Sequence, residues 1–237
     1  MPARNRDLHG FAPDSASTAL LILDLISDFE FPDGAAVLRS ALPVAERVRH
    51  LKARARAARI PAIYVNDNFG RWRSDFRELV RHCLRDGARG AEVVRLVEPD
   101  PEDYFILKPK HSGFYATALE TLLTYIGVDT VILTGVSTHQ CVLFTANDAY
   151  VRDLHIVVPS DCVAAVNAAQ TRFALRYFAT VLKADVRPSA RLTLAREHGG
   201  DRSSTPRKRA ATARARPMRS PRRPAEAGRT GSPHGSP

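Results

Sequence analysis

The sequence has few cysteines and no long apolar segment, and these absences exclude several classes of protein. Only three of 237 residues are cysteines, without disulfide-like spacing, so a disulfide-stapled secreted fold is not expected. No apolar run approaches the roughly 20 residues that a membrane-spanning helix needs. The N-terminal residues are polar and do not resemble a secretory signal. We therefore expect a cytoplasmic protein without a membrane partner.

Positive charge is concentrated near the C-terminal end. The formal net charge is +10, but residues 199–237 hold ten Arg or Lys and two acidic residues, a net of +8, which leaves +2 for residues 1–198. The segment 199–237 lacks Leu, Ile, Val and aromatic residues, so we expect a disordered tail. Its charge would permit non-specific contact with polyanions such as nucleic acid. A solvated extension without a role is favoured, because no aromatic side chain accompanies the arginines.

The remaining chain alternates between strand-like apolar runs and stretches with helical spacing. Strands are expected at 19–23, 62–65, 104–107, 130–133, 155–158 and 181–184. Helices are expected at 44–55, 113–125, 138–151 and 167–180, with Ser40 as the cap of the first and Pro43 in its first turn. This alternation predicts an α/β fold whose parallel sheet is covered on both faces. We expect one domain at 18–198, after an N-terminal extension at 1–17.

Three reactive side chains follow three of these strands. Cys141 comes shortly after the strand at 130–133, near the start of a helix, where the helix dipole would lower the pKa of its thiol. Asp24 follows the first strand and Lys108 the third. Each alone is compatible with a structural residue. An acid, a cation and a thiol together at the carboxyl ends of parallel strands indicate a nucleophilic site.

Three segments, in order, resemble the isochorismatase-like cysteine hydrolases, a family that includes nicotinamidases and N-carbamoylsarcosine amidohydrolase. They are Leu21-Ile22-Leu23-Asp24 with Phe29 after it, Lys108-Pro109-Lys110-His111-Ser112-Gly113-Phe114 with Thr117 after it, and Gly135-Val136-Ser137-Thr138 through Cys141-Val142 with Thr145 and Asp148-Ala149. The resemblance covers about residues 18–185. It implies a three-layer α/β/α fold with a six-stranded parallel sheet.

The resemblance also implies a catalytic triad of Asp24, Lys108 and Cys141. Lys110 is a rival for the lysine's role, but Lys108 lies four residues before Ser112, the interval typical of the family. The thiolate of Cys141 would attack a carbonyl, expel an amine and leave a thioester for water to hydrolyse. Asp24 would move the proton, and Lys108 would stabilise the thiolate.

Two backbone features are likewise implied by the resemblance. The N–H groups of Ser137 and Cys141 would form an oxyanion hole for the tetrahedral intermediate. The peptide bond between Val136 and Ser137 would be cis.

The chain departs from the family pattern after its second strand. Nicotinamidases carry an Asp-x-His pair there that binds a metal, whereas this chain has Asn66 and Asn68. Neutral amides are poor zinc ligands, and His82 alone makes no site, so we expect no metal and no cofactor. Ile26, where many members have Gln, is a second departure and concerns substrate orientation.

Several residues near these segments are candidates for the substrate pocket. They are Phe29, Asn66, Asn68, Trp72 and Phe114, with Arg71 or Arg73 as a candidate partner for a substrate carboxylate. The aromatic residues could equally be there for packing, and the asparagines for forming a turn after the strand. His139 should point away from Cys141, because residues two apart do not share a helix face. Cys83 and Cys162 are expected to be structural.

Together these features predict a metal-independent cysteine hydrolase that cleaves a C–N bond in a small amide substrate. The alternatives are a vinyl ether hydrolase of the isochorismate type, and a catalytically silent scaffold protein tethered to nucleic acid by its tail. The complete triad argues against both. Family members are commonly oligomeric, so a homo-oligomer is expected.

Overall fold

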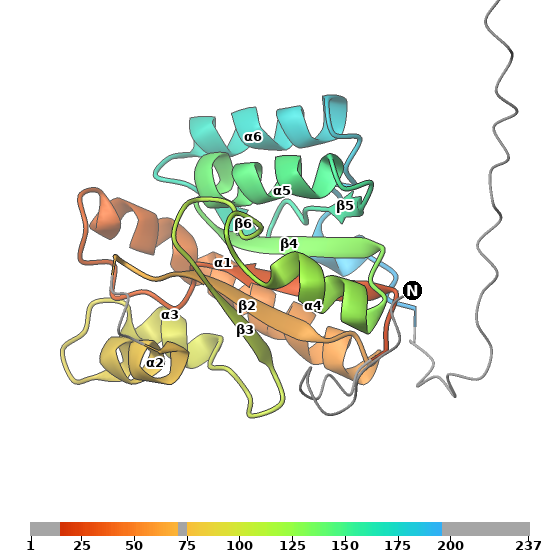
Figure 1. The fold of residues 1–237 in the computed structure, drawn as a ribbon. Helices are drawn as coiled ribbons and strands as arrows, with labels where there is room; N and C mark the ends of the chain where they lie inside the picture. Colours follow the sequence, from red (N-terminus) through yellow and green to blue (C-terminus); the bar gives the residue numbers. More distant parts are fainter. Residues whose placement is uncertain (1–14, 71–74, 196–237) are drawn as a thin grey trace, which may run out of the picture. The chain divides into compact units, whose positions relative to one another are not determined.

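The structure, a computed structural model, describes residues 15–70 and 75–195 (Figure 1). The expected tail at 199–237 and most of the N-terminal extension lie outside these ranges, as do Arg71, Trp72 and Arg73. Within the described ranges, no helix is both long enough and apolar enough to cross a bilayer.

Six parallel strands form one sheet, which confirms the predicted fold class. They are β1 (Thr18–Leu23), β2 (Ala62–Asp67), β3 (Tyr104–Lys108), β4 (Thr130–Val136), β5 (His155–Val157) and β6 (Val163–Ala164). The order is β3-β2-β1-β4-β5, and β6 pairs with the last residues of β4. The chain therefore proceeds in opposite directions from β1 and β4, which are neighbours. A crevice at the carboxyl ends of such a pair is where open parallel sheets bind ligands.

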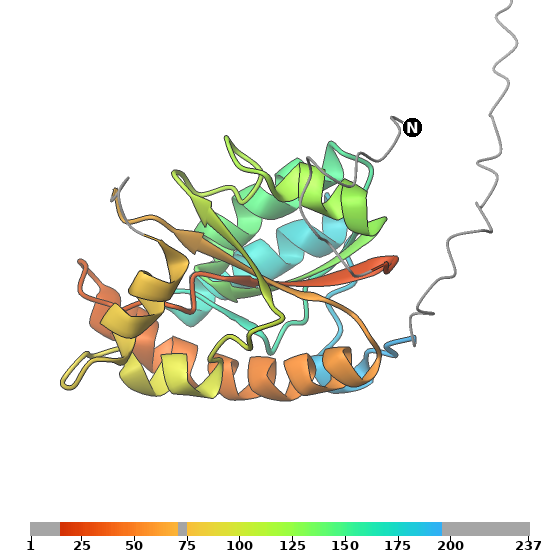
Figure 2. The ribbon, with the colours of Figure 1, turned by 60° about the horizontal axis from the view of Figure 1, so that its bottom comes forward.

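Helices cover both faces of the sheet. They are α1 (Gly34–Ala57), α2 (Phe76–Leu84), α3 (Ala91–Leu96), α4 (Leu119–Ile126), α5 (Leu143–Tyr150) and α6 (Ala168–Thr180). Figure 2 shows α1 and α3 beneath the sheet and α4, α5 and α6 above it. The side chains of β1 alternate between the two layers, because successive residues of a strand point to opposite faces. Leu20 and Ile22 pack with α1, whereas Leu21 and Leu23 pack with α4, α5 and α6.

The strand expected at 181–184 does not form, and β6 is the sixth strand instead. Val181 caps the C-terminus of α6, and its N–H donates to the carbonyl of Tyr177 at 2.8 Å. Leu182 and Ala184 are buried in the core, but the ladder contact there is an isolated bridge between Val157 and Asp185. The sequence pattern of this irregular segment resembled that of a strand, because alternate residues of the segment are buried.

The predicted start of the first helix is wrong. α1 begins at Gly34 rather than near Ser40, and it continues through Pro43. Gly34 is required there, because a Cβ atom would lie 2.1 Å from the carbonyl oxygen of Phe29. The close approach of the preceding loop to the helix therefore decides where α1 starts.

The other helices differ less from expectation. The helix expected from residue 113 begins at Leu119, and the residues before it form turns. The helix expected at 167–180 is α6, whose N-terminal cap is Asn167. The side-chain oxygen of Asn167 accepts a hydrogen bond from the N–H of Gln170 at 3.0 Å, which satisfies one of the free donors at the helix start.

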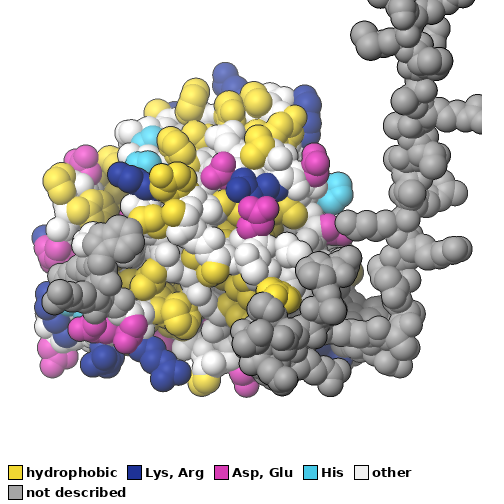
Figure 3. Space-filling model, in the orientation of Figure 1, with side chains coloured by type: hydrophobic (Ala, Val, Ile, Leu, Met, Phe, Trp, Pro, Cys, Tyr) yellow, Lys and Arg dark blue, Asp and Glu magenta, His cyan; other side chains and the backbone are white. Residues whose placement is uncertain are grey.

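Apolar side chains gather on the surface over α5 and α6 (Figure 3). Phe144, Tyr150 and Phe173 are each about half exposed or more. Exposed apolar patches often mark contact surfaces between proteins. The homo-oligomer stays a prediction.

Candidate active site

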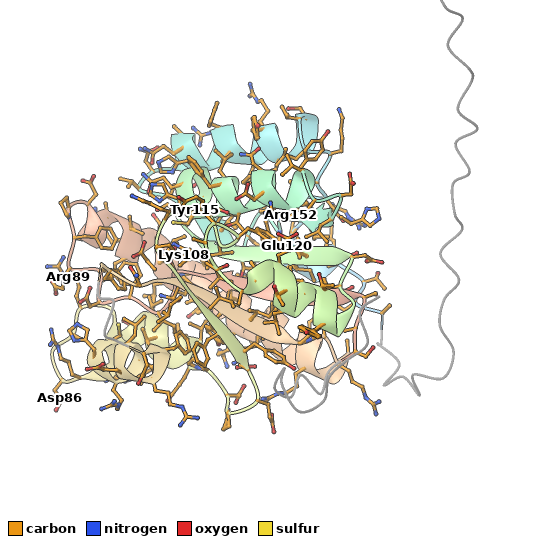
Figure 4. The ribbon with its side chains drawn as sticks, in the orientation of Figure 1. Asp86, Arg89, Lys108, Tyr115, Glu120 and Arg152 are labelled. Atoms are coloured by element: carbon orange, nitrogen blue, oxygen red, sulfur yellow. The ribbon has the colours of Figure 1, made fainter. Side chains whose placement is uncertain are left out.

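The three reactive side chains meet at the carboxyl edge of the sheet. Asp24 directly follows β1, Lys108 is the last residue of β3, and Cys141 lies in a π-helical turn (Thr138–Val142) between β4 and α5. Lys108 is fully buried, and Figure 4 shows it at the end of its strand. Its Nζ lies 2.9 Å from Oδ2 of Asp24 and 3.4 Å from Sγ of Cys141. Asp24 and Cys141 thus lie beyond the carboxyl ends of the neighbouring strands β1 and β4.

Asp24 is held in place by its neighbours. Its Oδ1 accepts a hydrogen bond from the N–H of Asp67 at 2.7 Å, and its backbone is in the left-handed region, with φ of 52°. The carboxylate of Asp67 lies 3.6 Å from Nζ of Lys108 and is a second negative neighbour of that ammonium. Sequence reasoning missed Asp67. It lies between the two asparagines that drew attention as departures from the family pattern.

The surroundings set the protonation states of the site. Burial raises the pKa of the Cys141 thiol above its ordinary value, and so does the charge of Asp24, against the opposing effect of Lys108. The expected lowering of this pKa is therefore wrong: Cys141 rests as a thiol. Burial acts to lower the pKa of Lys108, but the charge of Asp24, the hydrogen bond to Asp24 and the charge of Asp67 raise it above its ordinary value. An ammonium beside a carboxylate and a neutral thiol is the resting arrangement.

The turn before Cys141 departs from regular helix. The peptide bond between Val136 and Ser137 is cis, and the carbonyl of Ser137 accepts hydrogen bonds from the N–H groups of Gln140 and Val142. Gly135 has φ of 108°, and a Cβ atom there would lie 1.9 Å from the carbonyl oxygen of Leu23. Only glycine allows this close approach of β4 to β1 beside the crevice.

A histidine that sequence reasoning missed also contacts the thiol. Nδ1 of His111 lies 3.7 Å from Sγ of Cys141, and its ring packs against Phe144, with 5.4 Å between ring centroids. His111 lies directly before Ser112, three residues after Lys108, in one of the segments that carry the family resemblance. Its closeness to Lys108 in the sequence was the one indication that it could lie near the site. Burial lowers the pKa of His139, the histidine closer to Cys141 in sequence.

The loop after Lys108 is braced against α5. The hydroxyl of Ser112 donates to the carboxylate of Asp148, and the N–H of Gly113 donates to Oγ1 of Thr145 at 2.9 Å. Arg152 stacks 4.8 Å from the ring centroid of Phe114 and pairs with Glu120 at 2.8 Å (Figure 4). These contacts fix the backbone that carries His111.

The candidate pocket residues are distributed over different places. Phe29 and Phe114 are buried in the two apolar clusters on opposite faces of the sheet. Asn66 is fully buried, and Trp72 lies outside the described residues. Asn68 borders a cavity of about 240 Å³, whose lining includes Asp28, Phe31, Phe69, His82 and Leu107. Asp24, Lys108 and Cys141 do not line this cavity.

A model of the Isochorismatase domain family matches residues 18–187. The chain belongs to the isochorismatase family. An uncharacterized isochorismatase family protein, YaaI of Bacillus subtilis (strain 168), is 40% identical over 171 residues, which cover 72% of this chain and 93% of that protein. A ureidoacrylate amidohydrolase, RutB of Methylorubrum extorquens, is 27% identical over 189 residues, with 68% of this chain and 74% of that protein covered.

Solved structures of the isochorismatase family agree with this fold. The crystal structure of N-carbamoylsarcosine amidase from Thermoplasma acidophilum has a TM-score of 0.56 and 30% identity, and the match covers 74% of this chain and 98% of that chain.

The asparagines that follow the core of β2 offer neutral amide oxygens, which are poor ligands for zinc. Nδ2 of Asn66 donates to the carbonyl of Ile26 at 2.6 Å, and Oδ1 of Asn68 accepts from the N–H of Gly70 at 2.9 Å. His82 pairs with Asp28 at 2.9 Å. In the part of the chain that the structure describes, no three His, Cys, Asp or Glu side chains form a group that could hold a metal ion.

The two lysines of the family segment give a matched pair of variants. Lys110 is exposed, whereas Lys108 is the buried partner of Asp24 and Cys141. We expect Lys108→Met to lower kcat by at least about 100-fold, because it removes the ammonium that would stabilise a thiolate at Cys141. Lys110→Met should stay within about twofold of the parent. Turnover by both variants checks this, and a comparable loss in Lys110→Met would contradict the assignment.

Proposed function

We propose that this protein is an amidohydrolase that cleaves a non-peptide C–N bond of a small amide, with Cys141 as its nucleophile. One observation carries the proposal: a fully buried ammonium, that of Lys108, lies 2.9 Å from a carboxylate and 3.4 Å from a thiol at the ligand-binding edge of the sheet. The amidohydrolases among its relatives support the same reaction class.

The first half of the reaction moves one proton from sulfur to nitrogen. Asp24 takes the thiol proton of Cys141, and the resulting thiolate, stabilised by Lys108, attacks the amide carbon. Asp24 then gives the proton to the nitrogen as the C–N bond breaks. The amine leaves, and the acyl group stays on Sγ as a thioester.

The oxyanion of the tetrahedral intermediate needs donors that are already in place. We propose the backbone N–H groups of Ser137 and Cys141 for this role, since Cys141 lies in the π-helical turn and Ser137 is the residue that caps its N-terminus. Such donors cost no reorganisation when charge develops on the carbonyl oxygen.

The names of the relatives suggest the first substrates to test. Ureidoacrylate and N-carbamoylsarcosine are both compounds in which a carbamoyl group is bound to nitrogen. Ammonia release from a panel of ureido compounds and simple primary amides tests the proposal. Enzyme-dependent release from at least one of them supports it, whereas release that persists unchanged after removal of the thiol contradicts it.

Activity should not depend on a metal. Asn66 and Asn68 offer only neutral amide oxygens, that of Asn66 without a hydrogen-bond partner among the described residues and that of Asn68 bonded to Gly70, and neutral amides are poor zinc ligands. We expect exhaustive dialysis against a chelator to leave kcat/KM unchanged. Elemental analysis before and after dialysis provides the control. Stoichiometric metal whose removal abolishes turnover would show that this prediction is wrong.

A further inference from the structure

His111 gives Cys141 a second polar neighbour. Its Nδ1 lies 3.7 Å from Sγ, within the range of a sulfur hydrogen bond. The side chain is exposed, and one side of its ring is covered by Phe144, itself half exposed. The imidazole therefore connects the thiol to solvent.

The other two neighbours of the thiol are less exposed than His111. Lys108 is fully buried, and the side chain of Asp24 is 13% exposed. Oδ1 of Asp24 accepts a hydrogen bond from the N–H of Asp67, and Oδ2 is ion-paired with Lys108. Water that attacks a thioester on Sγ has to arrive from solvent, which is the side where His111 lies.

We propose that His111 is a further catalytic residue, the base that activates water for hydrolysis of the thioester. The inference rests on the proposed function, because it requires an acyl group on Cys141. A neutral imidazole is suited to this task at physiological pH, and its Nδ1 needs one intervening water to reach the carbonyl carbon.

The protons of this second half-reaction balance without another group. Water forms a bond to the carbonyl carbon and gives a proton to Nδ1 of His111. The tetrahedral intermediate collapses, the C–S bond breaks, and the electron pair returns to Sγ beside the ammonium of Lys108. The imidazolium then passes its proton across the 3.7 Å gap to the thiolate, which restores the resting thiol. Asp24 is already ionised again, having given its proton to the amine.

The loop geometry holds the imidazole where this role needs it. Ser112 is hydrogen-bonded to Asp148, and Gly113 to Thr145, directly after His111 in the chain. Both acceptors belong to α5, the helix that follows the turn with Cys141. Base and nucleophile are therefore attached to the same rigid element.

An activated ester tests the inference without knowledge of the natural substrate. p-Nitrophenyl acetate would acetylate Cys141 and release p-nitrophenolate before the acetyl group is hydrolysed. For His111→Ala we expect a burst of one p-nitrophenolate per active site, then a steady rate at least about 100-fold below that of the parent. Intact-mass spectrometry should find the acetyl group accumulated on Cys141. His111→Gln should behave alike.

Matched variants separate the ways in which the inference can fail. Lys110→Ala alters the neighbouring position of the same loop and should keep the parental steady rate, and Cys141→Ala should give no burst. Parental deacetylation in both His111 variants would overturn the inference and leave the proposed function intact. A slower burst without acetyl-enzyme would also overturn it, since His111 would then act before the thioester. No acetylation of Cys141 in the parent protein would refute the proposed function itself.

Discussion

Replacement of Cys141 by alanine is expected to reduce amide turnover by at least about 10⁴-fold while the fold is kept. No other group can take over the covalent step, and loss of the nucleophile in comparable enzymes removes nearly all catalysis. The thiol is small and buried, so alanine fits the same space. Ammonia release and melting temperature, measured on the same preparation, check both parts of the expectation.

Cys162→Ala is the matched control for this variant. Cys162 is also buried, and burial, with the charge of Asp161, raises the pKa of its thiol to about 12. It lies outside the group formed by Asp24 and Lys108, so turnover should be preserved. Undiminished hydrolysis by Cys141→Ala, or an equal loss in Cys162→Ala, would contradict a nucleophilic role for Cys141.

The fold could be predicted largely because strand burial leaves a simple pattern. Parallel strands with both faces covered appear as short apolar runs, and β1, β2 and β4 follow this pattern. The edge strands β3 and β5 are less buried but are still short apolar runs. The last strand is the exception. β6 has two residues, Val163 and Ala164, too few for any period, while the buried residues Leu182 and Ala184 imitated a strand.

The sequence could predict which residues lie at the ends of strands, but not the contacts that depend on loop paths and burial. Strand ends placed Asp24, Lys108 and Cys141 at one edge of a parallel sheet, and the structure brings these three side chains together. The protonation state of Cys141 could not be derived from the sequence. It depends on burial and on the nearby charge of Asp24, whereas the prediction considered only the position of Cys141 at the start of a helix. His111 was missed for the same reason, since its contact with Sγ depends on the path of the loop.

Asp24→Asn and Asp67→Asn form the second decisive comparison. Both carboxylates lie close to Nζ of Lys108, at 2.9 Å and 3.6 Å, so both variants remove one negative charge from the ammonium without changing side-chain size. Of the two carboxylates, Asp24 is the one proposed to take the proton of Cys141, whose pKa is raised by burial. We expect Asp24→Asn to lower kcat by about 10³-fold, the range of general acid–base catalysis.

Asp67→Asn should instead stay within about fivefold of the parent, because a partly exposed ion pair contributes up to about 1 kcal/mol. The backbone N–H of Asp67, which donates to Asp24, is kept in this variant. Burst kinetics add a second criterion: without its base, Asp24→Asn should lose the rapid acylation phase, whereas Asp67→Asn should retain it. Equal losses in the two variants would mean that the carboxylates act only through their charge on Lys108, and Asp24 would then not be the group that moves the proton.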